Sequence, residues 1–123
     1  MTDVYRILTQ EQWQESLTLG SISPNALDRK SGFMHLSGEA EVLETVARYF
    51  SADTLPIALR ISSEALGAAL KWEPVASRGG VAFPHLYADG IGLNLVQAAV
   101  ALCPHPGGDF TWGEVTSMSL ETK

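Results

Sequence analysis

The stretch Gly32-Phe33-Met34-His35-Leu36-Ser37 decides the fold, because an extended pattern changes there into a helical one. Its first five residues have the apolar and aromatic content of a strand. Ser37 is a residue type that caps helices, and residues 38–50 have apolar side chains at helical spacing. The stripe that this helix buries would be Val42, Val46, Tyr49 and Phe50. We therefore expect a strand that runs directly into a capped helix.

Working outward, strands alternate with short helices along the whole chain. We expect strands at residues 3–8, 55–61, 69–73, 83–87 and 98–102, and helices at residues 10–19 and 63–68. The first helix would begin after Thr9, end at Gly20 and carry Trp13 and Leu17 on one face. Residues 21–31, rich in Ser, Pro, Asn and Asp, are interpreted as a surface loop, and residues 112–123 as a frayed end. The pattern predicts an α+β fold with a β core flanked by short helices.

Composition narrows the kind of protein. The 123 residues are 46% hydrophobic and 18% charged, which is typical of one globular domain over residues 1–123. No apolar run reaches the ~18 residues of a membrane helix, no secretory signal pattern is seen, and there is one cysteine. We expect a cytoplasmic protein without a membrane segment. The net charge of −6 and the scattered basic residues argue against broad nucleic-acid binding. The partner we expect is a small-molecule ligand, on the grounds of the candidate site described next.

Four polar side chains form the candidate site. His35 stands in the strand before the helix, and imidazole changes charge near neutral pH. His85 and Tyr87 alternate, so an extended segment presents both on one face. Glu73 ends an apolar stretch, where a carboxylate can act as a general base or bind a structural partner. We interpret His35, Glu73 and His85 as catalytic candidates and Tyr87 as a wall of the same pocket.

Two other motifs do not support a site. Cys103-Pro104-His105 has a spacing that fits neither the usual zinc sites nor a catalytic pair held by a third group. We therefore expect no metal. Ser77-Arg78-Gly79-Gly80 is a flexible loop that has neither Walker nor Rossmann spacing, so a phosphate bound to its backbone amides is not indicated.

Four motifs occur in an order and spacing that resemble a known family. They are Val4-Tyr5-Arg6-Ile7, Gly32-Phe33-Met34-His35-Leu36-Ser37, Lys71-Trp72-Glu73 and Phe83-Pro84-His85-Leu86-Tyr87. The chain to about Pro104 resembles the bacterial family known as domain of unknown function 952. This resemblance implies the ADP-ribosylation fold, in which a split, mixed or antiparallel β core flanked by helices holds NAD in a cleft.

The resemblance also implies roles for single residues. Arg6 in the first strand would hold the nucleotide, and Ser37 would support the site. His35 and Tyr87 would flank the nicotinamide. Glu73 or His85 would be the polar catalytic group. The activity implied is that of an ADP-ribosyltransferase-like or NAD-cleaving enzyme, with NAD as the substrate.

Three alternatives stay open beside this one. The chain would be a protein–protein interaction domain if Trp13, Trp72 or Trp112 were exposed, because aromatic anchors are enriched at interfaces. The chain would be a catalytically inactive module that binds a nucleotide or small ligand if the cleft were kept and the chemistry lost. It would be an unrelated small hydrolase if His85 acted as the base and Glu73 oriented it. The hydrolase requires those two side chains to lie within hydrogen-bond reach.

Overall fold

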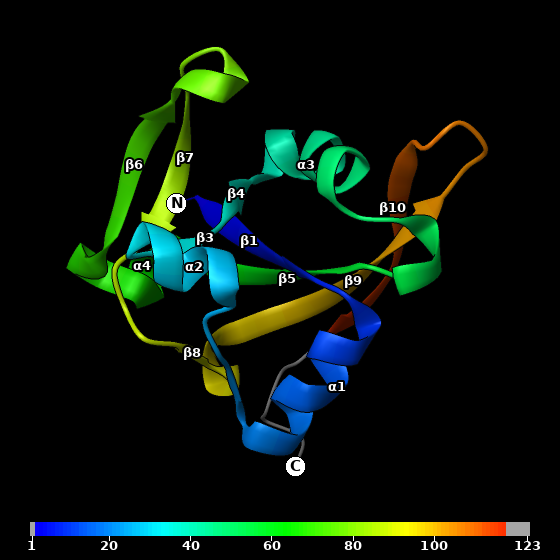
Figure 1. The fold of residues 1–123 in the computed structure, drawn as a ribbon. Coiled ribbons are helices and arrows are strands. Elements are labelled where there is room, and N and C mark those ends of the chain that lie inside the picture. The colour runs from blue at the N-terminus through cyan, green and yellow to red at the C-terminus, as the bar shows by residue number, and fades with distance from the viewer. Residues whose placement is uncertain (1, 118–123) are drawn as a thin grey trace.

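A five-stranded antiparallel sheet forms the centre of the molecule (Figure 1). The computed structural model describes residues 2–117. The strand order is β10-β9-β5-β1-β4. The bounds are β1 Asp3–Leu8, β4 Ser37–Gly38, β5 Ile57–Ser62, β9 Val96–Pro104 and β10 Phe110–Ser117. The strand predicted from the apolar run at residues 55–61 is confirmed as central, because β5 pairs with β1 on one side and β9 on the other.

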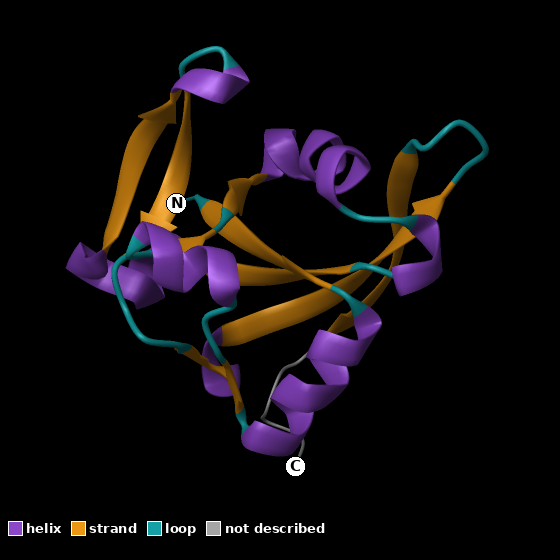
Figure 2. Ribbon diagram, viewed as in Figure 1, coloured by secondary structure: helices purple, strands orange, loops and turns teal. Residues whose placement is uncertain are grey.

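Two smaller sheets complete the β structure. Three strands pair in the order β3-β7-β6, and β2 pairs with β8. Their bounds are β2 Ser21–Ile22, β3 Met34–His35, β6 Leu70–Val75, β7 Val81–Leu86 and β8 Ile91–Gly92. β6 and β7 form a hairpin that projects from the rest of the molecule, and a 3₁₀ turn, Ala76–Arg78, lies at its tip (Figure 2). The expected α+β class with a split β core is confirmed.

Four α-helices accompany the sheets over residues 2–117: α1 Gln10–Leu19, α2 Ala26–Ser31, α3 Val42–Tyr49 and α4 Ser63–Leu66. The boundaries of α1 are those expected from the sequence. Thr9 and Gln12 form a capping box at its start, and Gly20 ends it in the left-handed conformation at φ 80°. Within the same range, no helix is long and apolar enough to cross a membrane.

The two helices α1 and α3 cover opposite faces of the five-stranded sheet (Figure 1). Alternation along β1 turns Val4 towards Trp13 of α1, and Tyr5 towards Val42 and Val46 of α3. All five side chains are buried. Removing each Val side chain from water contributes about 1.5–3 kcal/mol. The prediction that Val42 and Val46 form the buried side of α3 is therefore confirmed.

One expected core residue lies at the surface instead. Tyr49 of α3 is 64% exposed. Periodicity alone does not say how wide a stripe the sheet covers, so the prediction that Tyr49 is buried was wrong. On α1, Trp13 is buried and Leu17, one turn later, is 44% exposed.

The segment predicted as a loop contains structure. Residues 21–31 hold β2 and α2, and α2 begins with a capping box formed by Asn25 and Asp28. The end of the chain differs as well: residues 112–117 belong to β10, and the expected fraying of 118–123 lies outside the described residues.

Ser37 does not cap a helix. Its backbone pairs with Tyr5, so the chain stays extended through Gly38 and enters α3 only after a 3₁₀ turn, Glu39–Glu41. β3 belongs to the three-stranded sheet and β4 to the five-stranded sheet, with Leu36 alone between them. Residues 34–38 thus connect both sheets at the point where they diverge, and His35 lies at this junction.

Candidate functional site

A buried carboxylate, Asp28, joins three separate elements of the fold. Its Oδ2 lies 2.7 Å from Nη2 of Arg6 on β1, and its Oδ1 lies 2.7 Å from Nδ1 of His35 on β3. The backbone N–H groups of His35 and Asn25 also donate to it, at 3.0 and 2.8 Å. The side chains of Arg6 and Asp28 are 3% and 1% exposed. An ion pair this well buried and satisfied fixes α2 against both strands.

The tautomer of His35 follows from the ionisation of Asp28. Burial alone would raise the pKa of Asp28, but hydrogen bonds from His35 and Arg6 outweigh it and hold that pKa well below the usual range. An ionised carboxylate only accepts hydrogen bonds, so Nδ1 of His35 carries the proton. In the neutral imidazole, Nε2 then carries the lone pair that can take a proton from a ligand.

A second carboxylate holds the other histidine. Oε1 of Glu73 on β6 lies 2.7 Å from Nδ1 of His85 on β7, and the Tyr87 hydroxyl donates to the same oxygen at 2.7 Å. These two hydrogen bonds, first that of Tyr87, lower the pKa of Glu73, while the bond to Glu73 raises the pKa of Tyr87. His85 is therefore also oriented with its protonated Nδ1 on a carboxylate. Glu73 and His85 thus lie within hydrogen-bond reach of each other, as the hydrolase alternative requires.

The Phe33 ring contacts both histidines. Its ring stacks on His85 with centroids 4.0 Å apart and planes at 19°, and it contacts the His35 ring at 4.7 Å. The Tyr87 ring lies 5.5 Å from the same phenyl ring. The centroids of His35 and His85 are 6.1 Å apart. The pairing of β3 with β7 places His35 opposite His85, and Phe33 packs against both imidazoles, each of which is held by its own carboxylate.

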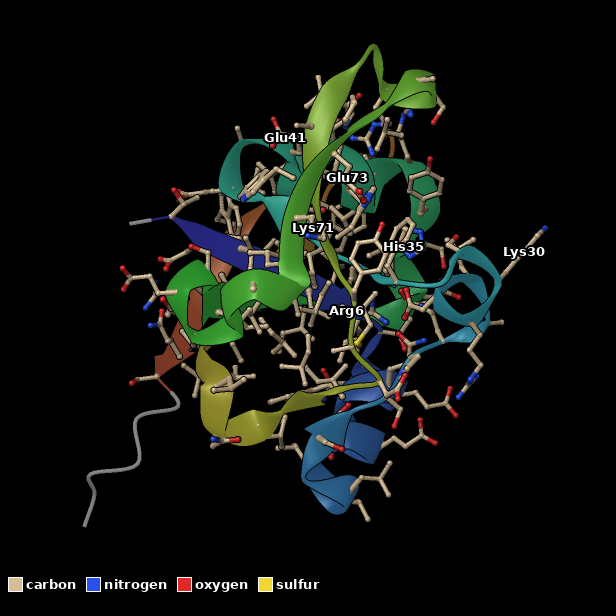
Figure 3. All side chains as sticks on the ribbon, turned by 90° about the vertical axis from the view of Figure 1, so that its left-hand side faces the viewer. Arg6, Lys30, His35, Glu41, Lys71 and Glu73 are labelled. Atoms are coloured by element: carbon tan, nitrogen blue, oxygen red, sulfur yellow. The ribbon has the colours of Figure 1, made fainter. Side chains whose placement is uncertain are left out.

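Both histidines line one cavity of about 540 Å³, which lies between α3 and the β6–β7 hairpin. This volume is within the range of small-molecule sites. Figure 3 views the molecule from the hairpin side, where Arg6, His35 and Glu73 are labelled. The cavity has cationic, polar and apolar walls formed by Arg6, Ile7, Asn25, Leu27, His35, Leu36, Ser37, Thr45, Tyr49, Phe50, Val75, Ser77, Arg78, Phe83 and His85.

The predicted site residues divide into two groups. Arg6, His35, Ser37 and His85 line the cavity. Glu73 and Tyr87 are not part of its lining and contact it through His85, so Tyr87 lies outside the wall where we expected it.

Arg6 lies in the cavity wall with most of its donors already used. Nη1 donates to the His35 carbonyl at 2.9 Å, and Nη2 donates to Asp28 at 2.7 Å. Its Nε is buried, with no hydrogen-bond partner among the described residues.

Sequence reasoning missed Asp28, Phe33, Thr45 and Arg78. The spacing of Asn25 and Asp28 is that of a capping box and would have placed a helix and a carboxylate before His35. Alternation puts Phe33 on the face of His35, which indicates the contact but not its partner on β7. Nothing in the sequence places Thr45 of α3 beside the hairpin tip.

No group of three or more His, Cys, Asp and Glu side chains within residues 2–117 is arranged to hold a metal ion. The histidines are instead each occupied at Nδ1 by a single carboxylate. The arrangement as it stands is suited to proton transfer at the two Nε2 atoms rather than to coordination.

Comparisons with known proteins identify relatives. A family model described as a protein of unknown function, DUF952, matches residues 7–101. The crystal structure of protein CC0527 from Caulobacter crescentus is similar, with a TM-score of 0.80 and 33% identity over 89% of this chain and 94% of that one. The solution NMR structure of CC0527 has a TM-score of 0.74 and 34% identity, covering 89% and 91%. Comparison with curated proteins found no match.

Proposed function

The chain belongs to the DUF952 family of proteins of unknown function, and we propose that it is an enzyme that binds a phosphate-bearing nucleotide and cleaves it by acid–base catalysis. NAD is the substrate we propose. One observation carries the enzyme proposal: two imidazoles, each held at Nδ1 by a carboxylate, line the same cavity. This arrangement presents two oriented Nε2 atoms to a bound molecule.

His85 is the general base in this proposal. Its Nε2 takes a proton from a water molecule as the water oxygen bonds to C1′ of the nicotinamide ribose. The C1′–N bond breaks, and its electron pair goes to the pyridinium nitrogen, so that neutral nicotinamide leaves. The ionised Glu73 carboxylate at Nδ1 stabilises the imidazolium that forms. His35 lies across the Phe33 ring, where it contacts the other side of the reacting group.

The choice of NAD rests on the resemblance of the motifs to the ADP-ribosylation fold and on the character of the cavity. Arg6 and Arg78 supply positive charge, while Phe50, Phe83 and Leu27 supply apolar surface. A dinucleotide has both phosphates and flat rings, so it matches both kinds of wall. Fold likeness by itself does not establish the reaction.

The test is release of nicotinamide from NAD by the full-length chain, measured by chromatography. We expect turnover to fall by about 100-fold in His85→Gln, which removes the base, and by about 10-fold in Glu73→Gln, which keeps the acceptor but not its charge. Glu64→Gln is the matched control, because Glu64 is exposed on α4 and its replacement removes the same charge as Glu73→Gln. Equal rates in His85→Gln and the unaltered chain would contradict the proposed base.

A second function, a nucleotide-binding module without turnover, is favoured by one specific observation. Among residues 2–117, no Asp or Glu side chain is part of the cavity lining. An oxocarbenium-like state at C1′ is best stabilised by a carboxylate in direct contact, and Glu73 is turned towards His85 and Tyr87 instead. Saturable binding of NAD in calorimetry with no release of nicotinamide would decide for the module.

A further inference from the structure

We propose that Arg78 and Thr45 form a phosphate-binding subsite, and that Arg78, not Arg6, is the cation that binds the anionic part of the ligand. The inference deepens the proposed function and rests on it for the nucleotide nature of the ligand. It concerns the tip of the β6–β7 hairpin and the facing side of α3.

Arg78 is a buried cation at the hairpin tip. Its side chain is 7% exposed and lines the cavity, with Cζ 4.6 Å from the centroid of the Phe83 ring. Nη2 lies 3.2 Å from Oε1 of Glu44, but the two are not in hydrogen-bonding geometry, and this buried nitrogen has no hydrogen-bond partner among the described residues. A guanidinium removed from water with an unfilled donor is costly unless a ligand completes it.

Thr45 presents a second unfilled group to the same cavity. Its Oγ1 is buried and makes no hydrogen bond within the part of the chain that the structure describes. Thr45 on α3 and Arg78 at the hairpin tip line the same cavity, and Glu44, the residue before Thr45, lies 3.2 Å from Arg78. A hydroxyl and a guanidinium that line one cavity are donors suited to a tetrahedral phosphate.

Arg6 is the other arginine of the lining, and it is less suited to this role. Asp28 and the His35 carbonyl occupy both of its terminal nitrogens. Its charge is balanced by a carboxylate that is itself buried. Among residues 2–117, the carboxylate that pairs with Arg78 is Glu44, whose side chain is 62% exposed and therefore remains accessible to water. An incoming phosphate therefore displaces Glu44 from Arg78 more readily than Asp28 from Arg6.

The position of Arg78 sets the distance between phosphate and reacting bond. Phe83 and His85 are two residues apart on β7 and lie on one face, so they are spaced by about 7 Å. Arg78 stacks on Phe83, and in our proposal the reacting C1′–N bond lies beside His85. The phosphate bound by Arg78 would therefore lie about the length of one ribose from that bond.

The backbone of the hairpin tip does not compete for this role. The N–H of Gly79 donates to the Ala76 carbonyl at 3.2 Å, and that of Gly80 donates to the Val75 carbonyl at 3.0 Å. These two amides are used by the turn itself. The residues 77–80, which lack a phosphate-loop spacing, therefore contribute through the Arg78 side chain.

The experiment is calorimetric titration of the full-length chain with ADP and, separately, with adenosine. We expect ADP to bind at least about 10-fold more tightly than adenosine. Arg78→Gln should weaken ADP by about 10-fold or more and leave adenosine unchanged. Thr45→Val, which keeps the shape of the side chain, should weaken ADP by about 3-fold, and Glu44→Gln should strengthen it by a similar factor.

Lys30→Gln is the matched control, since Lys30 is exposed on α2, extends away from the site (Figure 3) and carries the same charge. Equal ADP affinity in Arg78→Gln and Lys30→Gln, or no preference for ADP over adenosine in the unaltered chain, would overturn the subsite. If Arg78→Gln does not fold, the opposite shifts in Thr45→Val and Glu44→Gln decide. Failure to release nicotinamide leaves this result standing, because ADP lacks the nicotinamide altogether.

Discussion

Asp28 accepts two hydrogen bonds from His35, one from the backbone N–H at 3.0 Å and one from Nδ1 of the ring at 2.7 Å. A single carboxylate thus fixes both the strand that carries His35 and the direction of its imidazole. Glu73 orients the His85 ring in the same way, but from an exposed position on a neighbouring strand. The two histidines are therefore held with unequal strength.

Replacing Asp28 should lower the free energy of unfolding. Asp28→Asn removes the charge that balances buried Arg6, and breaking a buried pair costs about 3–5 kcal/mol. We expect a loss of this size in the free energy of unfolding, measured by urea denaturation followed by circular dichroism. Asp109→Asn, an exposed carboxylate in the β9–β10 turn, is the control and should change it by less than about 0.5 kcal/mol. Similar losses in both variants would contradict a buried ion pair.

The same carboxylate predicts a dependence of stability on pH. The pKa of Asp28 is lower in the folded protein than its value of 3.8 in an unfolded chain. The unfolded state therefore binds a proton first as the pH falls, so the stability that Asp28 contributes is complete above about pH 5 and is lost progressively below pH 3.8. We expect the difference between the unaltered chain and Asp28→Asn to shrink over this range in urea titrations. A constant difference down to pH 2.5 would show that the charge of Asp28 is not responsible.

Local patterns predicted the elements of the fold better than their contacts. The ends of α1 and the central position of β5 follow from a capping box and an apolar run, which are properties of neighbouring residues. Ser37 was misjudged because its pairing with Tyr5 is a long-range contact that overrides its preference for a helix cap. The composition of residues 21–31 does not distinguish a loop from a helix start, because Ser, Asn and Asp are common in both, and here Asn25 and Asp28 cap α2.

For the candidate site, too, the sequence predicted the features within one strand but not the contacts between elements. Alternation placed His85 and Tyr87 on one face, and the structure joins both to Glu73. Asp28 and Arg78 were missed because their roles depend on which elements pack together. Pairing of β3 with β7 brings His35 beside His85, and no pattern within either strand contains that register.

The hydrogen bond from Tyr87 to Glu73 predicts that Tyr87 ionises at a higher pH than a free tyrosine, and that Glu73→Gln abolishes this shift. Glu73 raises the pKa of Tyr87 because it accepts a bond from the neutral hydroxyl, and burial raises the pKa of Tyr5. An absorbance titration at alkaline pH should therefore show late ionisation of both tyrosines. In Glu73→Gln the Tyr87 component should move to lower pH while that of Tyr5 stays, and Tyr87→Phe identifies the component. An unchanged curve in Glu73→Gln would exclude the bond in solution.

Phe33 should matter for the chemistry more than for the fold. Its ring is half-buried and contacts both imidazoles and the Tyr87 ring, so Phe33→Ala removes three ring contacts of about 0.5–1.5 kcal/mol each and frees His85 to turn away from the cavity. We expect a loss of about 1–3 kcal/mol in the free energy of unfolding and a fall in turnover of nucleotide beyond what the folded fraction explains. Phe33→Leu restores apolar bulk without a ring face, so it should recover stability but not turnover. Recovery of both by Leu would mean that Phe33 only fills space, whereas recovery of stability alone assigns it to the spacing of His35 and His85.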